Sequence, residues 1–277
     1  MGFRIATNVS SLTAQRSLKR ISNDEQTTAA QMASGSRITK SSDDSAGLAI
    51  SEKLKANIRS SQQANRNAND GIGMIQVAEG GLQESANILI RLRELAIQSA
   101  SDTVGQTERE YTNMEYSQLK DELQRISQTT QFNDVKLLDG SSDKLEFQIG
   151  SGNDQFEDRI VYDPSKINSG LAALGMDGES VDTKEGAQGS LEKVDSAIKV
   201  VSGQRAELGA LQNRLITTSA NLETSVENMS AANSRIRDVD YAEVTAKNTQ
   251  NNIMKQAGIS VLSQANATPQ QALRLIG

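Results

Sequence analysis

Two pairs of carboxylates are the side chains best placed to do chemistry in this sequence. Asp43 and Asp44 are adjacent, and Asp238 and Asp240 lie two positions apart. Neighbouring carboxylates can divide the roles of general acid and general base. Aspartate is also a preferred residue just before a helix, where its oxygen accepts the free N–H groups of the first turn. We interpret both pairs as helix caps or solvated turns, and we predict no catalytic residue.

The residue types that are missing exclude most enzyme chemistry. Histidine and cysteine are both absent, which removes thiol nucleophiles, disulfides, Cys/His zinc sites and the imidazole base. The glycine-rich run GSGND at 150–154 lacks the following Lys and Ser or Thr of a phosphate loop. We therefore predict no metal, no cofactor and no small-molecule substrate. An enzyme that uses a carboxylate pair and a binding protein or secreted adhesin with a long stalk stay open as alternatives to a structural subunit.

The composition favours long helices over a deep globular core. Of 277 residues, 36% are apolar and 3% are aromatic, and there is no Trp. No run approaches the roughly 18 to 20 apolar residues that a membrane-spanning helix needs. The first ten residues lack the charged, apolar and small-residue order of a cleavable signal. We expect a chain that neither spans a membrane nor carries a cleavable export signal.

The charge is unevenly placed along the chain. Residues 1–42 hold six cations and two acids, whereas the whole chain has a net charge of −6. The cations are spread through a polar amphipathic pattern without interleaved aromatic residues, which favours a solvated or self-contacting face over a nucleic-acid site. We therefore predict no nucleic-acid partner.

A strict seven-residue apolar repeat runs through the C-terminal half of the chain. Such a repeat keeps a narrow apolar stripe on one side of a long helix, which is stable in water only when another helix covers it. The positions four residues further on, such as Arg205 and Gln212, are mostly polar, so we predict a bundle within the chain rather than a free-standing zipper. The repeat consists of Val194, Val201, Leu208, Leu215, Leu222, Met229 and Ile236.

A second long helix is predicted to cover this repeat. It should begin after Ser42 or Asp43 as its N-cap, run to about residue 99 and lie antiparallel to the first. Its own stripe is again close to heptad spacing, and the residues expected to pack in the bundle are Ile75, Leu82 and Leu89.

The segment after the second helix predicts a third helix and one hairpin. The third helix should be shorter and end near residue 129 or 130. Residues 145–149 and 159–162 are rich in β-forming residues and flank the GSGND loop, which predicts one small β-hairpin at about 143–163. The fold class is therefore mainly α, a long antiparallel helical bundle or coiled coil with one small hairpin.

The two ends of the chain are amphipathic but poor in large apolar side chains. Helices are predicted over 3–33 and over 241–266, the second interrupted by Gly258 and stopped by Pro269. Ordering a residue costs on the order of 1–2 kcal/mol, and stripes this weak return less than that. Some partner must cover both ends. The residues predicted to mediate this self-assembly are Ile5, Val9, Leu12, Leu18, Ile21, Ile253, Ala257, Val261, Leu262 and Leu273.

Several runs at both ends match one known family. In the N-terminal half they include IATNVSSLTAQRSL (5–18), SGSRITKSSDDSAGLAIS (34–51) and RNANDGIGMIQVAEGGLQE (66–84). In the C-terminal half they include LGALQNRL (208–215) and VLSQANATPQQALRLI (261–276). The chain resembles bacterial flagellin, the subunit of the flagellar filament. Residues 141–190 leave no room for large variable outer domains, so the resemblance is to a minimal flagellin.

The resemblance implies a structural subunit that self-assembles into the filament, the propeller for swimming motility. A hook-filament junction protein of the same architecture is the alternative, and the close match of RLRELAIQSA (91–100) favours the filament protein. The family pattern also implies that the N- and C-terminal helices pair. Residues 1–42 and 236–277 would form the inner core of the filament, and residues 43–235 a helical rod with the hairpin.

The same resemblance implies partners and a location. The partners would be other copies of the chain, the hook-filament junction and cap proteins, and an export chaperone on the C-terminal segment. The protein would be secreted through type III export and reside in the extracellular filament. An innate immune receptor of the Toll-like class would contact Arg91, Leu95 and Glu115. Arg91 and Leu95 are four residues apart on one helix face, and packing between neighbouring subunits explains these residues equally well.

Overall fold

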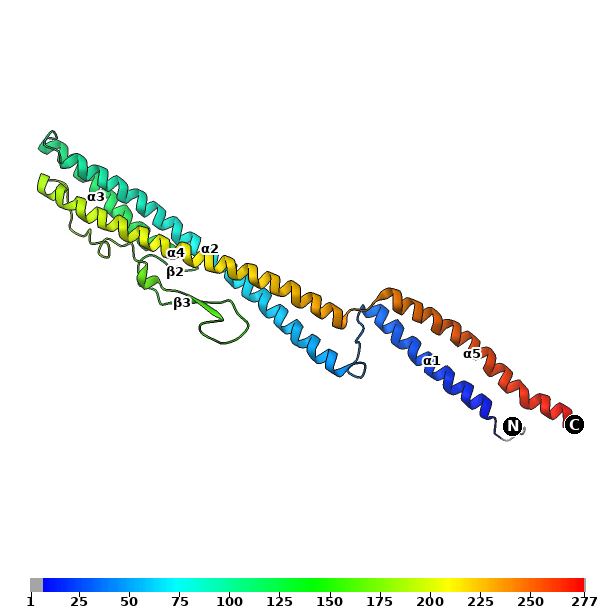
Figure 1. Cartoon of the computed structure of the whole chain (residues 1–277). Helices are drawn as coiled ribbons and strands as arrows, with labels where there is room; N and C mark the ends of the chain where they lie inside the picture. Colours follow the sequence, from blue (N-terminus) through cyan, green and yellow to red (C-terminus); the bar gives the residue numbers. More distant parts are fainter. Residues whose placement is uncertain (1–6, 277) are drawn as a thin grey trace. The chain divides into compact units, whose positions relative to one another are not determined.

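The computed structural model describes residues 7–276, with side chains up to residue 268, and most of this chain is helical (Figure 1). Two small antiparallel sheets are present, and the chain forms two compact units, residues 1–56 with 228–277 and residues 57–227. The predicted mainly α fold with one hairpin inside 143–163 is confirmed, whereas the β1–β2 sheet was not predicted. The elements are α1 (Val9–Ser34), α2 (Ser45–Ser99), α3 (Gln106–Thr129), β1 (Gln131–Phe132), β2 (Val135–Lys136), β3 (Leu145–Gln148), β4 (Arg159–Tyr162), a 3-10 turn (Pro164–Lys166), α4 (Lys184–Arg237) and α5 (Tyr241–Ile276).

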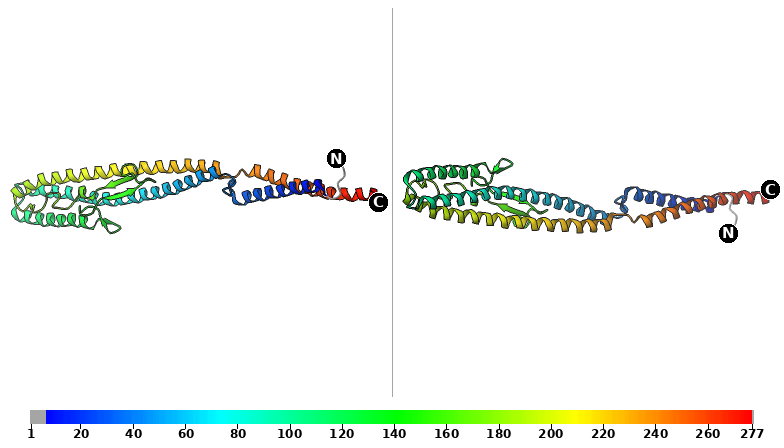
Figure 2. Two further views of the ribbon diagram at one scale, coloured as in Figure 1. Left: turned by 90° about the horizontal axis from the view of Figure 1, so that it is seen from below. Right: turned by 90° about the horizontal axis from the view of Figure 1, so that it is seen from above.

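The unit of residues 57–227 has a continuous apolar core. Within it α2, α3 and α4 lie side by side (Figures 1 and 2). The first four residues of the α4 repeat, from Val194 to Leu215, are fully buried, and so are Ile75, Leu82 and Leu89 of α2. Further along α4 the repeat is only half-buried at Leu222. The α4 repeat therefore does most of its packing in its N-terminal part.

A second buried row of α4 lies three residues after the repeat positions. Ala197 and Gln204, three residues after the repeat positions, are buried, whereas Arg205, four residues after, is only partly buried. Positions three and four residues on flank the repeat on opposite sides of a helix. The loop before α4 covers the first side, since Gln204 Nε2 donates to Asn168 O at 3.0 Å. The polar positions four residues on are thus only partly buried at Arg205, and the second buried row of this stretch lies three residues after the repeat.

The β3–β4 hairpin is fixed to the helices through its buried face. In β4, Ile160 and Tyr162 are buried while Val161 between them is exposed, as the alternation of a strand requires. Tyr162 Oη donates to Leu137 O at 2.9 Å, and this burial raises the pKa of the Tyr162 phenol. On the β3 side, Asn67 of α2 donates through Nδ2 to Gln148 O at 2.9 Å.

The carboxylates at the helix starts act as caps and turns. Asp44 Oδ1 accepts the Gly47 N–H at 2.8 Å, so Asp44 caps α2 and the predicted N-cap at Ser42 or Asp43 is wrong. Asp43 instead closes the preceding turn, where its Oδ2 accepts the Lys40 and Thr39 N–H groups. These bonds, that from Lys40 first, lower the pKa of Asp43. At the other end of the chain, Asp240 Oδ1 accepts the Ala242 N–H at 2.9 Å and caps α5.

In the unit formed by the two ends of the chain, α1 and α5 are antiparallel neighbours (Figure 2). Gly35 ends α1 in the left-handed conformation, with φ of 66°, which glycine adopts without strain. Its carbonyl then accepts the Val239 N–H at 3.1 Å. The breaks that follow α1 and precede α5 are therefore held together by backbone hydrogen bonds.

The predicted interruption of the last helix at Gly258 and its stop at Pro269 are wrong, because α5 runs through both. A Cβ at position 258 would lie 2.8 Å from Leu18 Cδ2, so the glycine makes room for Leu18 of α1. Proline has no N–H, which leaves the carbonyl four residues earlier without its helical donor. That carbonyl belongs to Ala265, and Asn8 Nδ2 donates to it at 2.8 Å.

Adjacent residues of α4 allow a test of the core. Leu215 is 0% exposed and Ile216 is 47% exposed. We expect Leu215→Ala to lower the free energy of unfolding by about 2–5 kcal/mol, because it leaves a cavity. Ile216→Ala should cost about 0.5 kcal/mol or less. Urea unfolding of the monomer, followed by helical circular dichroism, measures both, and equal losses would contradict the assignment of the core face.

Candidate self-association surface

The seam between α1 and α5 is made mainly of polar contacts. Ser11 Oγ donates to Asn266 Oδ1 at 2.8 Å, and Lys255 Nζ forms an ion pair with Glu25 Oε2 at 2.7 Å. Asn251 of α5 is buried. Exposed or half-exposed ion pairs and hydrogen bonds contribute little net free energy compared with burial of large apolar side chains. The seam aligns the two helices but adds little stability.

Several apolar side chains of α5 are exposed, away from the seam with α1. Ile253 is 63% exposed and Val261 is 59% exposed, and Ala257 between them is also exposed. Residues two positions apart on an α-helix point about 200° apart, so Ile253 and Ala257 lie opposite the seam position Lys255. Val261, six positions on, lies on the flank of the helix, about 120° from Lys255. We name Ile253, Ala257 and Val261 the outer stripe of α5. In α1, Val9 and Leu12 are likewise exposed.

The residues predicted for self-assembly therefore fall into two groups. Leu18, Ile21 and Leu262 are half-buried. Val9, Leu12 and the outer stripe are exposed. Ile5 and the side chain of Leu273 lie outside the described residues. Sequence reasoning placed both groups in one set, and it missed further exposed apolar side chains of α5 that follow no regular spacing, namely Tyr241, Met254 and Ile259.

A single amide joins the start of α1 to α5. Asn8 Oδ1 accepts the Ser11 N–H at 3.1 Å and so caps α1. Its Nδ2 donates to Ala265 O, the carbonyl that Pro269 leaves without a helical donor. Both halves of the Asn8 side chain thus satisfy helix backbone groups that would otherwise lack partners.

The three residues predicted to contact a receptor do not share one surface. Arg91 Nη2 of α2 forms an ion pair with Glu115 Oε1 of α3 at 2.8 Å, and its Nη1 bonds Glu94 Oε2 at 2.9 Å. Leu95 is 2% exposed and belongs to the core, so the prediction of a surface role for its side chain is wrong. The α2 face that carries Leu95 is turned inward, while Arg91 at its edge reaches across to α3. Glu94 was missed.

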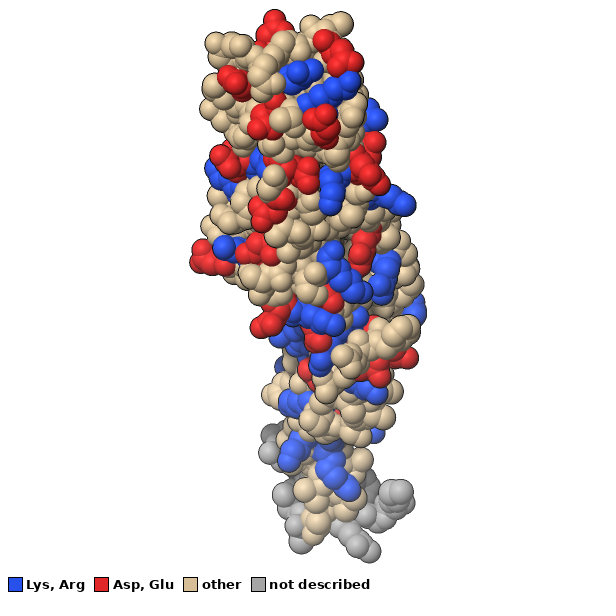
Figure 3. Space-filling view, turned by 90° about the vertical axis from the view of Figure 1, so that its left-hand side faces the viewer, with Lys and Arg blue, Asp and Glu red and all other residues tan. Residues whose placement is uncertain are grey.

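The remaining surface carries mixed charge. Over the wider part of the face seen in Figure 3, acidic and basic side chains are interspersed, whereas toward its narrow lower end basic side chains predominate. Among the residues that the structure describes, no His, Cys, Asp or Glu side chains form a group of three that could hold a metal ion. In that same part of the chain, no helix is long and apolar enough to cross a membrane.

Comparisons with known proteins decide which family has this arrangement. A family model for the bacterial flagellin N-terminal helical region matches residues 5–143, and one for the C-terminal helical region matches residues 191–276. The chain belongs to the bacterial flagellin family. Flagellins are structural proteins that polymerise into the extracellular flagellar filament, which agrees with the expected absence of catalysis.

Relatives match over almost their whole length. A flagellin of Halalkalibacterium halodurans is 41% identical over 269 residues, which cover 97% of this chain and 98% of that protein. A flagellar filament core protein of Brachyspira hyodysenteriae is 41% identical over 287 residues, covering 98% and 99%. A crystal structure of Bacillus cereus flagellin has a TM-score of 0.50 and 28% identity, covering 61% of this chain and 94% of that chain. These names support a filament subunit and do not favour the hook-filament junction alternative.

The double role of Asn8 leads to a prediction. Asn8→Asp keeps an oxygen for the Ser11 N–H but removes the donor to Ala265 O. We expect amide exchange in the C-terminal part of α5 to become up to about tenfold faster, since loss of a hydrogen bond to this half-buried carbonyl costs about 1 kcal/mol. Hydrogen-exchange mass spectrometry of the C-terminal peptides measures this.

A second substitution provides the control. Pro269→Ala restores an N–H that can bond to Ala265 O within the helix, so Asn8→Asp should have a smaller effect in that background. An effect of Asn8→Asp that is equally large with Pro269 and with Ala at that position would show that the proline does not create the need for Asn8.

Proposed function

We propose that neighbouring subunits of the flagellar filament cover the outer stripe of α5 and the exposed Val9 and Leu12 of α1. The observation that carries the proposal is the exposure of the outer stripe, which lies outside the seam that α5 forms with α1. Large apolar side chains contribute about 1.5–3 kcal/mol each when they are buried. In a filament, contacts between different patches on successive copies supply that burial.

Folding of the ends and polymerisation would then be coupled. The polar seam aligns α1 with α5, but the larger apolar side chains gain burial only from other copies. Coupled folding and binding of this kind lowers the affinity per unit area because ordering is completed at the moment of association. The assignment of residues 1–42 and 236–277 to the inner core of the filament follows from this proposal. Helices break close to both boundaries, at residues 35–44 and 238–240.

The proposal extends to the partners of a secreted filament subunit. Junction and cap proteins would contact the two ends of the filament, and an export chaperone would bind the C-terminal segment. Its apolar outer stripe offers a surface for such a chaperone before assembly. Secretion through a narrow type III export channel requires an unfolded chain, and a sequence without cysteine forms no disulfide that would hinder it.

Polymerisation tests the role of the outer stripe. The double variant Ile253→Asn and Val261→Thr removes apolar burial that exists only in the filament, so the critical concentration should rise at least about tenfold. The monomer should keep its unfolding free energy, because both side chains are exposed. Sedimentation and electron microscopy after salt-induced polymerisation measure the first quantity. Val200→Thr, at an exposed valine of α4, is the matched control and should polymerise like the parent chain. A double variant that forms filaments as well as the parent chain would reject the proposal.

Recognition by a Toll-like receptor is proposed for Arg91 and Glu115, without Leu95. Both charged side chains are about half exposed. We expect the Arg91→Asp monomer to signal at least about tenfold more weakly in an epithelial reporter assay, as is common when an interface arginine is lost. Arg125→Asp changes a similar arginine, which pairs with Glu122 on α3, and should signal normally. Undiminished signalling by Arg91→Asp would reject this contact.

A further inference from the structure

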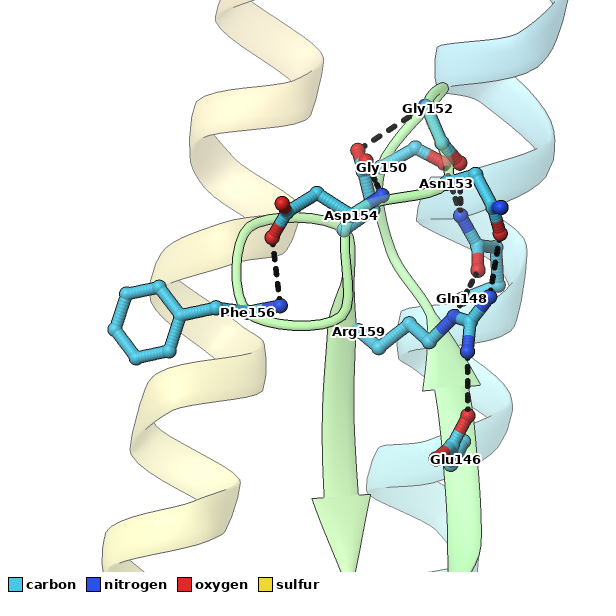
Figure 4. A network of polar contacts seen from close by, with 9 residues as sticks. Glu146, Gln148, Gly150, Gly152, Asn153, Asp154, Phe156 and Arg159 are labelled. Atoms are coloured by element: carbon cyan, nitrogen blue, oxygen red, sulfur yellow. Dashed lines mark hydrogen bonds and ion pairs between the residues drawn. The ribbon is translucent and has the colours of Figure 1, made fainter.

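Phe156 is the most exposed large apolar side chain among those described, at 90%. The chain has four phenylalanines and no tryptophan, and one of these few large aromatic residues lies in the loop between β3 and β4. In Figure 4 the ring points away from the polar contacts of the loop, toward the side on which α4 lies. Such a side chain stabilises a structure only when another surface covers it and removes it from water.

The loop that carries Phe156 is held rigid by hydrogen bonds (Figure 4). Asp154 Oδ1 accepts the N–H groups of Phe156 at 2.8 Å and of Glu157 at 3.0 Å. These bonds, that from Glu157 first, lower the pKa of Asp154, so the carboxylate stays ionised. The Asp158 carboxylate accepts the N–H of Gly152 at 3.1 Å and that of Asp154 at 2.9 Å. A preorganised anchor loses little conformational entropy when it binds.

A groove separates this loop from α4. Its floor contains the buried Ile149 and Ile160, and Phe156 forms one wall. Arg214 lines the opposite wall, on α4, and Glu157 next to Phe156 lies on the loop side. The other lining residues of α4 are polar, namely Asn213, Thr217 and Thr218. The guanidinium of Arg214 has no hydrogen bond or ion pair with any other side chain in the part of the chain that the structure describes. We name Ile149, Phe156, Ile160 and Arg214 the Phe156 groove.

A complementary patch lies on α3. Tyr111 and Met114, three residues apart, are both exposed, and the exposed Glu110 lies on the same side of the helix. Among described residues the Glu110 carboxylate has no ion pair. We name Glu110, Tyr111 and Met114 the α3 patch. Its aromatic and sulfur-containing side chains match Phe156 and the apolar floor of the Phe156 groove, and its carboxylate matches the unpaired Arg214, through aromatic and sulfur–aromatic contacts and opposite charge.

We propose that the Phe156 groove of one subunit binds the α3 patch of the next subunit in the filament. This inference rests on the proposed polymerisation of the chain and adds a second contact to it. Both surfaces belong to the unit of residues 57–227, but they are different surfaces, so each copy can offer its groove to one neighbour and its patch to another. Repeated contacts of this kind do not close on themselves and continue along a polymer.

Charge exchange between two variants tests the contact. Arg214→Glu and Glu110→Arg each place like charges in it, so each variant alone should show a critical concentration about tenfold higher than the parent chain. An equal mixture of the two should recover, because every groove with the Arg214→Glu change can then meet a patch with the Glu110→Arg change, and every unchanged groove an unchanged patch. Failure of the mixture to polymerise better than either variant alone overturns the proposal.

Cross-linking locates the contact directly. The chain has no cysteine, so the double variant Phe156→Cys and Met114→Cys should give a ladder of disulfide-linked oligomers when its filaments are oxidised. Phe156→Cys with Val200→Cys should not. Filaments that form without this ladder overturn the contact and leave the proposed function standing. Failure of the unchanged parent chain to polymerise would instead overturn the proposed function.

Discussion

The polar seam between α1 and α5 is the constraint on which the behaviour of this chain depends. The unit of residues 57–227 buries full rows of Leu, Ile and Val, and it needs no partner to do so. In the unit formed by the chain ends, the buried apolar side chains among described residues are Ile38, Val239 and Val244, near the helix breaks rather than along the seam. Two helices joined in this way are aligned but weakly stabilised.

The polar contacts of the seam set the register of α1 on α5. Buried or partly buried polar groups contribute little stability, yet those that are paired here find their partners in only one alignment. Asn8 meets Ala265 and Glu25 meets Lys255 in the same antiparallel alignment. A shift of one helix along the other would leave these groups without partners. The subunit can therefore present a defined outer stripe while the stability of its ends stays low.

Local periodicity explains which parts of the fold could be predicted. The α4 repeat and the hairpin are properties of short stretches, so spacing alone predicts them. The inward turn of Leu95 and the outward turn of Ile253 depend on which side meets a neighbouring helix, and the sequence of one helix does not contain that information. The course of α5 past Pro269 depends on a hydrogen bond from Asn8, far away in sequence. The β1–β2 turn uses Asn133 and Asp134 with positive φ, a weaker signal than Asn-Gly.

The two proposed contacts differ in what association must order. Covering the ends of the chain completes the folding of two weakly stabilised helices, so part of the free energy of burial is offset by lost conformational entropy. The Phe156 groove and the α3 patch belong to a unit that is already packed, and a contact between them needs little ordering. A preorganised contact of this kind can hold an arriving subunit while its ends fold against their neighbours. Weakening the groove should therefore act mainly on the capture of subunits, and weakening the outer stripe mainly on their retention.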